Sequence, residues 1–262
     1  PTMPLDGPDR LLAGAAVVVA VYGILFGAAE LLRRWGVDGE RTRSLVHVMA
    51  AILALGLPYL FGSPWPVVVL AVAFAASMIV SRRLGLLGSI HDVRRETVGA
   101  AMFPLGIAAA YVLTAGQVPG YPIAVLALGL GDPAAAVAGR RCAHRYAAIW
   151  GTRRSLEGSA VACLVSGMAA IVVLQIAGGV GWLSLVPMAL AVGVAVALAE
   201  ATSPLGFDNL AIPSVAAIVV DVAGRPWWLA AIAVALAMVT AAGVARDDSV
   251  RVGLARRYGR VP

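Results

Sequence analysis

The sequence contains no lysine and very little charge of either sign. Charged residues make up 13% of its 262 residues, whereas about a quarter of a soluble globular domain is charged. The mean hydropathy is +0.90, and 61% of the residues are hydrophobic. This composition excludes an ordinary soluble domain and predicts an integral membrane protein. Its apolar runs are too long and uniform for barrel strands, and a chain in lipid must satisfy its own backbone hydrogen bonds. The expected fold class is therefore an all-α bundle of membrane helices.

Several common sources of chemistry are absent as well. The two cysteines, Cys142 and Cys163, have neither a spacing that pairs them nor the spacing of metal ligands. The chain has no glycine-rich loop ending in Lys-Ser or Lys-Thr and no soluble-kinase signature, so a nucleotide would have to bind in another way. No fixed-period repeat or low-complexity linker divides the chain. We therefore expect residues 1–262 to form a single membrane domain.

Nine apolar runs in the sequence approach the length of roughly 20 residues that a membrane-spanning helix needs. They cover residues 11–32, 45–62, 65–81, 98–115, 121–139, 157–177, 182–199, 209–223 and 226–245. The eighth run is short, so it either spans the membrane or is re-entrant. Asp6 and Asp9 precede the first run, where a secretory signal would carry basic residues. We therefore expect residues 1–10 to form an extracytoplasmic segment that leads into a membrane helix.

Eighteen of the 20 arginines lie in four segments, which are 33–44, 82–97, 140–156 and the basic tail 246–262. With nine helices, all four segments fall on one side of the membrane. The positive-inside rule makes that side cytoplasmic, which places the N-terminus outside and the tail inside. The net charge of +6 thus indicates topology and phosphate binding, and no basic domain outside the membrane is expected to bind nucleic acid. Abundant Ala, Gly and Arg without lysine is typical of a GC-rich prokaryotic genome, so a prokaryotic cell membrane is the expected location.

A single aspartate, Asp132, interrupts the fifth apolar run several residues inside its cytoplasmic end. A charge at that depth costs a few kcal/mol unless it faces a partner or a wet cavity. Pro133 behind it removes a backbone donor, and Gly131 before it allows close approach to the backbone. A salt bridge to an arginine is one explanation. A functional carboxylate, most simply a metal ligand, is the favoured one.

The polar segment before the sixth run ends in RRSLEGS, residues 153–159. Arg153 and Arg154 present planar guanidinium groups that match phosphate oxygens. Ser155 and Glu157 are typical of a helix start, whose free N–H groups also attract anions. Helix capping alone is the alternative explanation, but capping does not require the arginine pair.

Polar residues also mark the mouths of other runs on the same side. Asp208 and Asn209 open the eighth run and are hard oxygen ligands suited to Mg²⁺, although both are also good helix caps. Glu200 ends the seventh run. Arg43 and His47 stand four residues apart on one face of a helix start, where a lone histidine is as often structural as functional.

Arg95 and Glu96 give a similar basic and acidic mouth to the fourth run. Arg, Asp, Glu, Asn and His from five distant segments are thus expected at one membrane face. Phosphoryl transfer needs positive groups for phosphate and oxygens for Mg²⁺ close together. An apolar helical bundle beside them would admit a lipid-like substrate from the bilayer.

At these residues the chain resembles a known family, the CTP-dependent lipid-alcohol kinases, which include dolichol, phytol and farnesol kinases and the yeast-type diacylglycerol kinase. The resemblance is carried by GDPAAAVAGRR (131–141), RRSLEGS (153–159) and DNLAIP (208–213), with weaker matches at RSLVH (43–47) and RRETVG (94–99).

The resemblance implies transfer of the γ-phosphate of a nucleotide, CTP favoured over ATP, to an isoprenoid alcohol or diacylglycerol, with Mg²⁺ or another divalent cation. The nucleotide-binding residues that it implies or that we add from their position are Gly131, Arg153, Arg154, Ser155, Glu157, Gly158, Arg43 and Arg140. The expected metal ligands are Asp132, Asp208 and Asn209, and the carboxylate that accepts the alcohol proton is Asp132 or Glu96. His47, Arg95 and Glu200 are expected beside them.

The chain departs from the family pattern at a few positions. The family usually has lysine where Arg153 and Arg154 stand, a basic residue at the position of Ser44, and a glycine within the stretch that here reads CAHRY (142–146). These changes leave open which nucleotide and which alcohol are used. The oligomeric state is not indicated.

Two other functions fit some of the same residues. A cytidylyltransferase that makes a CDP-lipid would release pyrophosphate, but its dense acidic and basic signature near the C-terminus is not found here. A small-solute or lipid transporter could use Asp132 as a coupling site, and inverted repeats, which are also not found, would favour it.

Overall fold

The computed structural model describes residues 7–91, 98–149, 152–178 and 181–223. The predicted ninth run at 226–245, the basic tail at 246–262, and both Arg95 and Glu96 lie outside these residues, as do the first six residues of the segment expected outside the membrane.

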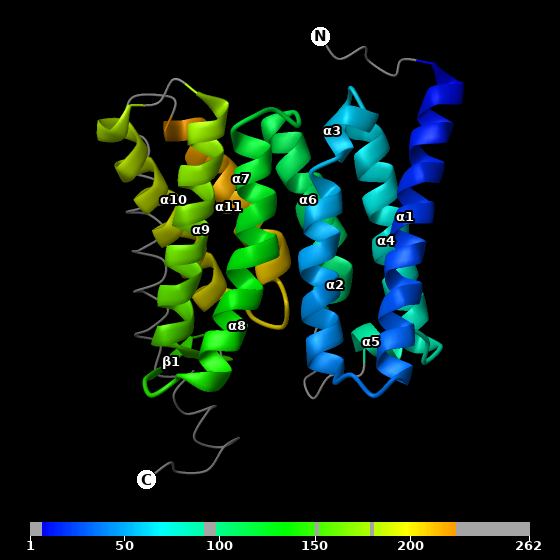
Figure 1. Cartoon of the computed structure of the whole chain (residues 1–262), viewed down its shortest axis with the longest axis horizontal. Helices are drawn as coiled ribbons and strands as arrows, with labels where there is room; N and C mark the ends of the chain where they lie inside the picture. The colour runs from blue at the N-terminus through cyan, green and yellow to red at the C-terminus, as the bar shows by residue number, and fades with distance from the viewer. Residues whose placement is uncertain (1–6, 92–97, 150–151, 179–180, 224–262) are drawn as a thin grey trace.

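Long helices lie side by side along one common direction, with short connections at the two ends of the bundle (Figure 1). The first half of the described chain forms seven helices, which are α1 (Pro8–Arg34), α2 (Gly39–Ala54), α3 (Leu57–Leu60), α4 (Pro64–Arg83), α5 (Gly88–His91), α6 (Gly99–Thr114) and α7 (Gly120–Leu126). A π-helical segment, η1 (Ala127–Gly131), follows α7. The remaining elements are α8 (Asp132–Arg141), strands β1 (Tyr146–Ile149) and β2 (Thr152–Ser155), and helices α9 (Leu156–Ala177), α10 (Trp182–Thr202) and α11 (Asp208–Ala223).

The predicted helical membrane bundle is confirmed. Among the described residues, six helices are long and apolar enough, by length and composition, to cross a membrane. They are 8–34, 39–60, 64–83, 120–141, 156–177 and 182–202, where the second joins α2 to α3 and the fourth joins α7, η1 and α8. Helices α6 and α11 have 16 residues each, fewer than a simple span needs, so the count of nine spans is not confirmed.

The two ends of the bundle differ in chemistry. Helices α1, α4 and α8 all finish at the same end (Figure 1), and each finishes with an arginine pair. We call this the basic end, defined by Arg33, Arg34, Arg82, Arg83, Arg140 and Arg141. Exposed aromatic side chains lie at both ends: Trp35, which follows α1 at the basic end, is 72% exposed, and Tyr59, Trp65 and Trp182 toward the opposite end are each at least 70% exposed. Aromatic side chains of this kind sit at the boundary between lipid and water.

Glycines let neighbouring helices approach closely. A Cβ atom at Gly106 of α6 would lie 2.0 Å from the carbonyl oxygen of Asn209 on α11, and one at Gly129 of η1 would lie 2.2 Å from the Cβ of Ala51 on α2. A Cβ at Gly193 of α10 would lie 2.5 Å from a carbonyl oxygen of α9. Small residues at crossings are how membrane helices pack, because lipid supplies no hydrophobic force between them.

Two local features go beyond the sequence expectation. Pro133 was expected to loosen the helix of the fifth run, and the structure shows that this helix widens to a π-helix over Ala127–Gly131, directly before Asp132. Pro133 has no N–H to donate in the α-helical pattern, which favours such an irregularity. The polar segment 140–156 was expected as a loop, but it contains the antiparallel pair β1 and β2, with Arg154 opposite Ala147.

Candidate active site

Polar side chains from five elements meet near the basic end of the bundle. Arg43 and His47 come from α2, Asp132 from the first turn of α8, Arg154 from β2, Glu200 from α10, and Asp208 and Asn209 from the first turn of α11. Asp132 and Asp208 both interact electrostatically with the imidazole of His47, and Asp132 also interacts with Arg154 and Glu200. The structure therefore brings these sequence-predicted residues into one cluster, which we call the polar cluster.

His47 lies against the π-helical segment. Its Nε2 atom donates a hydrogen bond to the carbonyl oxygen of Leu128 at 3.1 Å and lies 3.8 Å from Oδ2 of Asp132. Its ring packs edge-on to Phe103, with ring centroids 4.7 Å apart. The histidine side chain is only 10% exposed. The π-helical segment thus supplies the Leu128 carbonyl that orients His47. Asp132, the residue that directly follows the segment, supplies the carboxylate beside His47.

Arg154 is held between α10 and α11 by two carboxylates. Its guanidinium donates to Oε1 of Glu200 and to Oδ2 of Asp208, each at 2.8 Å, and to the carbonyl oxygen of Ser203 at 3.1 Å. The second oxygen of Glu200 accepts from the hydroxyl of Ser159 at 3.1 Å. Burial opposes the charge of Arg154, but the two carboxylates outweigh it and raise the pKa of Arg154 above its ordinary value. The arginine therefore remains cationic.

This network bears on two sequence-predicted roles. Arg154 is expected to bind nucleotide phosphate and Asp208 to bind metal, but in the structure these two side chains are bonded to each other. Both roles stay predictions, and a ligand would meet each side chain as part of this ion pair. Asp132, whose carboxylate is 22% exposed next to His47, is not part of this direct ion pair.

The RRSLEGS segment forms β2 and the start of α9. The hydroxyl of Ser155 accepts a hydrogen bond from the N–H of Gly158 at 3.0 Å, which confirms that Ser155 caps α9, and the nucleotide role of the segment stays a prediction. A Cβ at Gly158 would lie 2.7 Å from that hydroxyl oxygen and 3.0 Å from the carbonyl oxygen of Ala135, so a glycine is needed where α9 begins against α8. Arg153 lies on β2, paired with Ala148.

Three other predicted nucleotide-binding residues have structural contacts. One carboxylate oxygen of Glu157 accepts from the backbone N–H groups of His144 and Arg145, at 3.1 and 3.2 Å, and so fixes the start of the hairpin. Arg140 lies at the basic end, 3.8 Å from the carboxylate of Glu40, in a largely exposed ion pair. A Cβ at Gly131 would lie 2.5 Å from the hydroxyl oxygen of Ser166, so this glycine permits close packing of η1 against α9.

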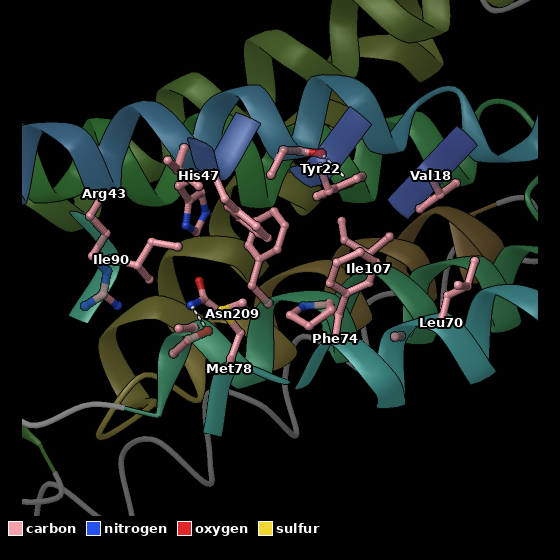
Figure 2. Close-up of a pocket in the computed structure, with 18 of the residues that line it drawn as sticks. Val18, Tyr22, Arg43, His47, Leu70, Phe74, Met78, Ile90, Ile107 and Asn209 are labelled. Carbon is pink, nitrogen blue, oxygen red and sulfur yellow. Dashed lines mark hydrogen bonds between the residues drawn. The ribbon is translucent and has the colours of Figure 1, made fainter. Parts of the chain in front are cut away.

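An apolar pocket runs from the polar cluster into the bundle, between α1, α2, α4 and α6 (Figure 2). Its polar end is lined by Arg43, His47 and Asn209, and its cavity volume is about 100 Å³. A water molecule needs roughly 10–15 Å³ measured in this way, so the pocket has room for several small groups in a row.

Aromatic and aliphatic side chains line the rest of the pocket. Tyr22 and Phe26 on α1 pack against Phe74 on α4, with ring centroids 5.4–6.5 Å apart. The hydroxyl of Tyr22 is satisfied within the wall, because it donates to the carbonyl oxygen of Ala50 at 2.8 Å. Val18 lies farther along, on the side away from Arg43 (Figure 2). The pocket is therefore polar at one end and apolar along the remainder of its length.

The pocket was missed at the sequence level, as was the contribution of Ser159 and Phe103 to the polar cluster. The sequence did carry one indication of the pocket wall. Tyr22 and Phe26 stand four residues apart and therefore share one face of α1. Their partner Phe74 lies on another helix, and nothing in a single sequence pairs α1 with α4.

Comparisons with known proteins give one informative match. A phytol kinase from Synechocystis sp. (strain ATCC 27184 / PCC 6803 / Kazusa) is 33% identical to this chain over 218 residues, which cover 80% of this chain and 90% of the relative. No protein-family profile matches the chain. No solved structure matches it either.

Proposed function

The chain belongs to the phytol and polyprenol kinase family, and from that premise we propose that it transfers the γ-phosphate of CTP to the hydroxyl of an isoprenoid alcohol in the membrane. It is an integral membrane phosphotransferase with an alcohol acceptor. The choice of CTP and of an isoprenoid alcohol, and the location of the reaction at the cytoplasmic face, are the parts that we add.

The observation that carries the proposal is the apolar pocket that ends at the polar cluster. A lipid alcohol has a long apolar tail and one polar atom that reacts. The pocket offers apolar walls along its length and Arg43, His47 and Asn209 at one end. An alcohol bound with its tail among the aromatic side chains would therefore present its hydroxyl near Asp132, which lies 3.8 Å from His47.

The nucleotide is proposed to bind on the water side of the same cluster. Arg43 and the hairpin residues Arg153 and Arg154 provide cationic groups for its phosphates. Arginine beside transferring phosphate stabilises the charge that develops there. The motif RRSLEGS, which in the family is linked to the nucleotide, supports a nucleotide site at this hairpin, and CTP as the donor follows from the resemblance.

A divalent metal fits the donor set at this end. Among the described residues, no group of three or more His, Cys, Asp or Glu side chains is arranged as a metal cage. Mg²⁺ on a nucleotide is held by one or two carboxylates together with phosphates and water, so it needs no such cage. Asp132 would hold it, with Asp208 at the same end, and the bound metal would neutralise phosphate charge.

In the proposed reaction, the alcohol oxygen forms a bond to the γ-phosphorus while the bond from that phosphorus to the β-phosphate oxygen breaks. CDP leaves, and the hydroxyl proton passes to a carboxylate, either Asp132 at this end or Glu96, which lies outside the described residues. The protein contributes mainly by positioning the two substrates and by surrounding the phosphates with fixed charges. The helices exclude water from the alcohol, which disfavours hydrolysis of the nucleotide.

A product assay on purified protein in detergent tests the proposal. It uses γ-³²P-labelled CTP or ATP with Mg²⁺ and phytol, farnesol, a polyprenol or diacylglycerol. We expect label in an isoprenoid phosphate, with CTP the better donor. Label found only in pyrophosphate would replace the proposal with a cytidylyltransferase, and no turnover by folded protein would favour a transporter.

A further inference from the structure

Asn209 carries a buried acceptor without a partner. Its side chain is only 4% exposed, and its Nδ2 atom donates to the carbonyl oxygen of Gly99 at 2.8 Å. Among the residues that the structure describes, its Oδ1 atom accepts no hydrogen bond. A buried acceptor left in this state is unfavourable, because it has lost its hydrogen bonds to water and gained none in return. An exception of this kind in a pocket wall points to a ligand that supplies the missing donor.

The amide of Asn209 is fixed in place. The backbone N–H of Asn209 donates to the Asp208 carboxylate at 2.9 Å, and the bond to Gly99 ties its side chain to α6. The glycine at position 106 lets the backbone of Asn209 lie directly against α6. Figure 2 shows the amide oxygen directed into the pocket, toward the side on which His47 lies. The oxygen is thus preorganised for a donor inside the pocket.

Beyond this oxygen the pocket offers only an apolar path of limited length. From His47 to Leu57, which also lines the pocket, α2 and α3 rise by about 15 Å at 1.5 Å per residue. Val18, Leu57 and Val67 line the far part, and each is at most 6% exposed. The dimensions fit one extended hydrocarbon chain whose polar end lies at Asn209.

We propose that this pocket is the binding site of the acceptor alcohol, that the substrate hydroxyl donates its hydrogen bond to Oδ1 of Asn209, and that the far wall sets the length of chain accepted. This inference rests on the proposed function. It gives Asn209 a role in holding the alcohol, where the sequence pattern had indicated a metal ligand. The occupant is a single-chain aliphatic alcohol, since the pocket has one apolar path leading from the orphaned oxygen.

The first test separates the alcohol role of Asn209 from a metal role. We expect Asn209→Ala to raise the KM for phytol about tenfold, the factor that corresponds to one lost hydrogen bond of ordinary strength. The KM for the nucleotide and the Mg²⁺ concentration that gives half-maximal rate are expected to stay unchanged. The control is Ser214→Ala on the same helix, because that hydroxyl donates only to Leu210 of its own helix, at 2.7 Å. A weakened Mg²⁺ dependence with an unchanged phytol KM would overturn the inference.

The second test fills the far part of the pocket. Ala71 of α4 lines the pocket and is 5% exposed, whereas Val72 beside it is 55% exposed and faces away from the core. We expect Ala71→Phe to lower kcat/KM for phytol at least about tenfold relative to geraniol, since a buried aromatic ring removes space that only the longer chain uses. Val72→Phe is expected to keep the wild-type ratio. Equal ratios for all three proteins would contradict a length limit in this pocket.

A binding measurement without nucleotide keeps the two proposals distinct. We expect phytol alone to raise the Tm of the wild-type protein in detergent and to raise that of Ala71→Phe less, because a ligand stabilises only the state that binds it. If the wild type phosphorylates no alcohol, the proposed function fails. If it phosphorylates phytol while both pocket variants match the wild type in KM, chain preference and Tm shift, the alcohol site lies elsewhere and this inference alone fails.

Discussion

At the scale of single residues, the contact that most affects the account is the buried ion pair of Arg154 with Glu200 and Asp208. It joins β2 to α10 and α11 and so fixes the hairpin that carries RRSLEGS. A buried pair of this kind is costly to break, because removing one partner leaves a buried charge without full compensation. Arg154 therefore has a structural role, because it holds the hairpin against α10 and α11 whether or not it also contacts phosphate during turnover.

Replacing Glu200 by glutamine tests this structural role. We expect Glu200→Gln to lower the free energy of unfolding by about 2 kcal/mol, because a glutamine oxygen can still accept from Arg154 but no longer carries the charge that pairs with it. Thermal unfolding in detergent measures the change. The matched control is Glu40→Gln, whose exposed pair with Arg140 should contribute under about 1 kcal/mol. Equal unfolding temperatures for both variants and the wild type would contradict a stabilising role for the pair.

His91 predicts a pH dependence outside the membrane-spanning helices. Burial, together with the nearby charges of Arg82 and Arg43, lowers the pKa of His91 from 6.5. The unfolded chain therefore binds this proton at a higher pH than the folded protein does. We expect the stability of the fold to be complete above pH 6.5 and to fall as the pH decreases below it. Thermal unfolding at a series of pH values should show this loss in the wild type and a smaller loss in His91→Gln. The same pH profile in both proteins would exclude His91 as its source.

Many residues of the polar cluster could be predicted from the sequence, but the contacts between them could not. Charges are rare in an apolar sequence, so Asp132, Arg154 and Glu200 stand out by contrast alone. Their partners depend on the fold, since Arg154 bonds to residues 46 and 54 positions later. His47 was interpreted as equally structural or functional, and only the π-helical segment brings it within 3.8 Å of Asp132.

At the scale of elements, the crossing of α6 with α11 holds the polar end of the pocket. Asn209 enters the pocket from α11, and Gly99 and Phe103 enter it from α6. Gly106 allows this crossing, because any side chain there would meet the backbone of Asn209. The position of the Asn209 amide oxygen therefore depends on Gly106, a residue without a side chain.

A methyl group at this crossing should disturb both stability and activity. We expect Gly106→Ala to lower the Tm and to lower kcat/KM for phytol, since α6 and α11 must separate to relieve a 2.0 Å contact. Gly23→Ala in α1 is the control, because no atom lies within 4 Å of its added Cβ. Alanine at that exposed helical site should be neutral or slightly stabilising. Identical behaviour of the two variants would show that the crossing is not tight.

Helix positions were predictable at this scale because the length and uniformity of the apolar runs report them directly. The π-helical segment and the hairpin were not. A π-helix changes the backbone hydrogen-bond register without changing the apolar pattern, so Ala127–Gly131 reads in sequence as ordinary helix. The hairpin strands have four residues each, too few for an alternating pattern to stand out.

At the scale of the whole molecule, the described bundle has arginine pairs and the polar cluster at one end, and exposed aromatic side chains at both ends. The positive-inside rule predicts that the basic end faces the cytoplasm. This orientation would give the site access to nucleotide on one side and to membrane alcohol through the helices. The distribution of arginine was readable from sequence, whereas the pocket was not, because its walls come from seven helices between α1 and α11.

Cysteine labelling tests the orientation directly. Cys142 is exposed at the basic end, and Cys163 can be replaced by alanine to remove background. We expect a membrane-impermeant maleimide to label Cys142 in inside-out vesicles and not in intact spheroplasts. In a protein lacking both native cysteines, Ser63→Cys, exposed between α3 and α4, should give the reverse pattern. Labelling of Cys142 from outside the cell would invert the proposed topology.

Asp132 is proposed to lie where phosphate is transferred, and the rate of Asp132→Asn is the decisive measurement of that role. The measurement is kcat for phosphorylation of phytol from labelled CTP, on protein that inserts and unfolds like the wild type. The control is Asp9→Asn, at the start of α1. We expect kcat to fall at least about 100-fold in Asp132→Asn, which is the effect of removing one group that stabilises charge during the reaction. We expect kcat of the control to match that of the wild type. Wild-type activity in Asp132→Asn would contradict the account.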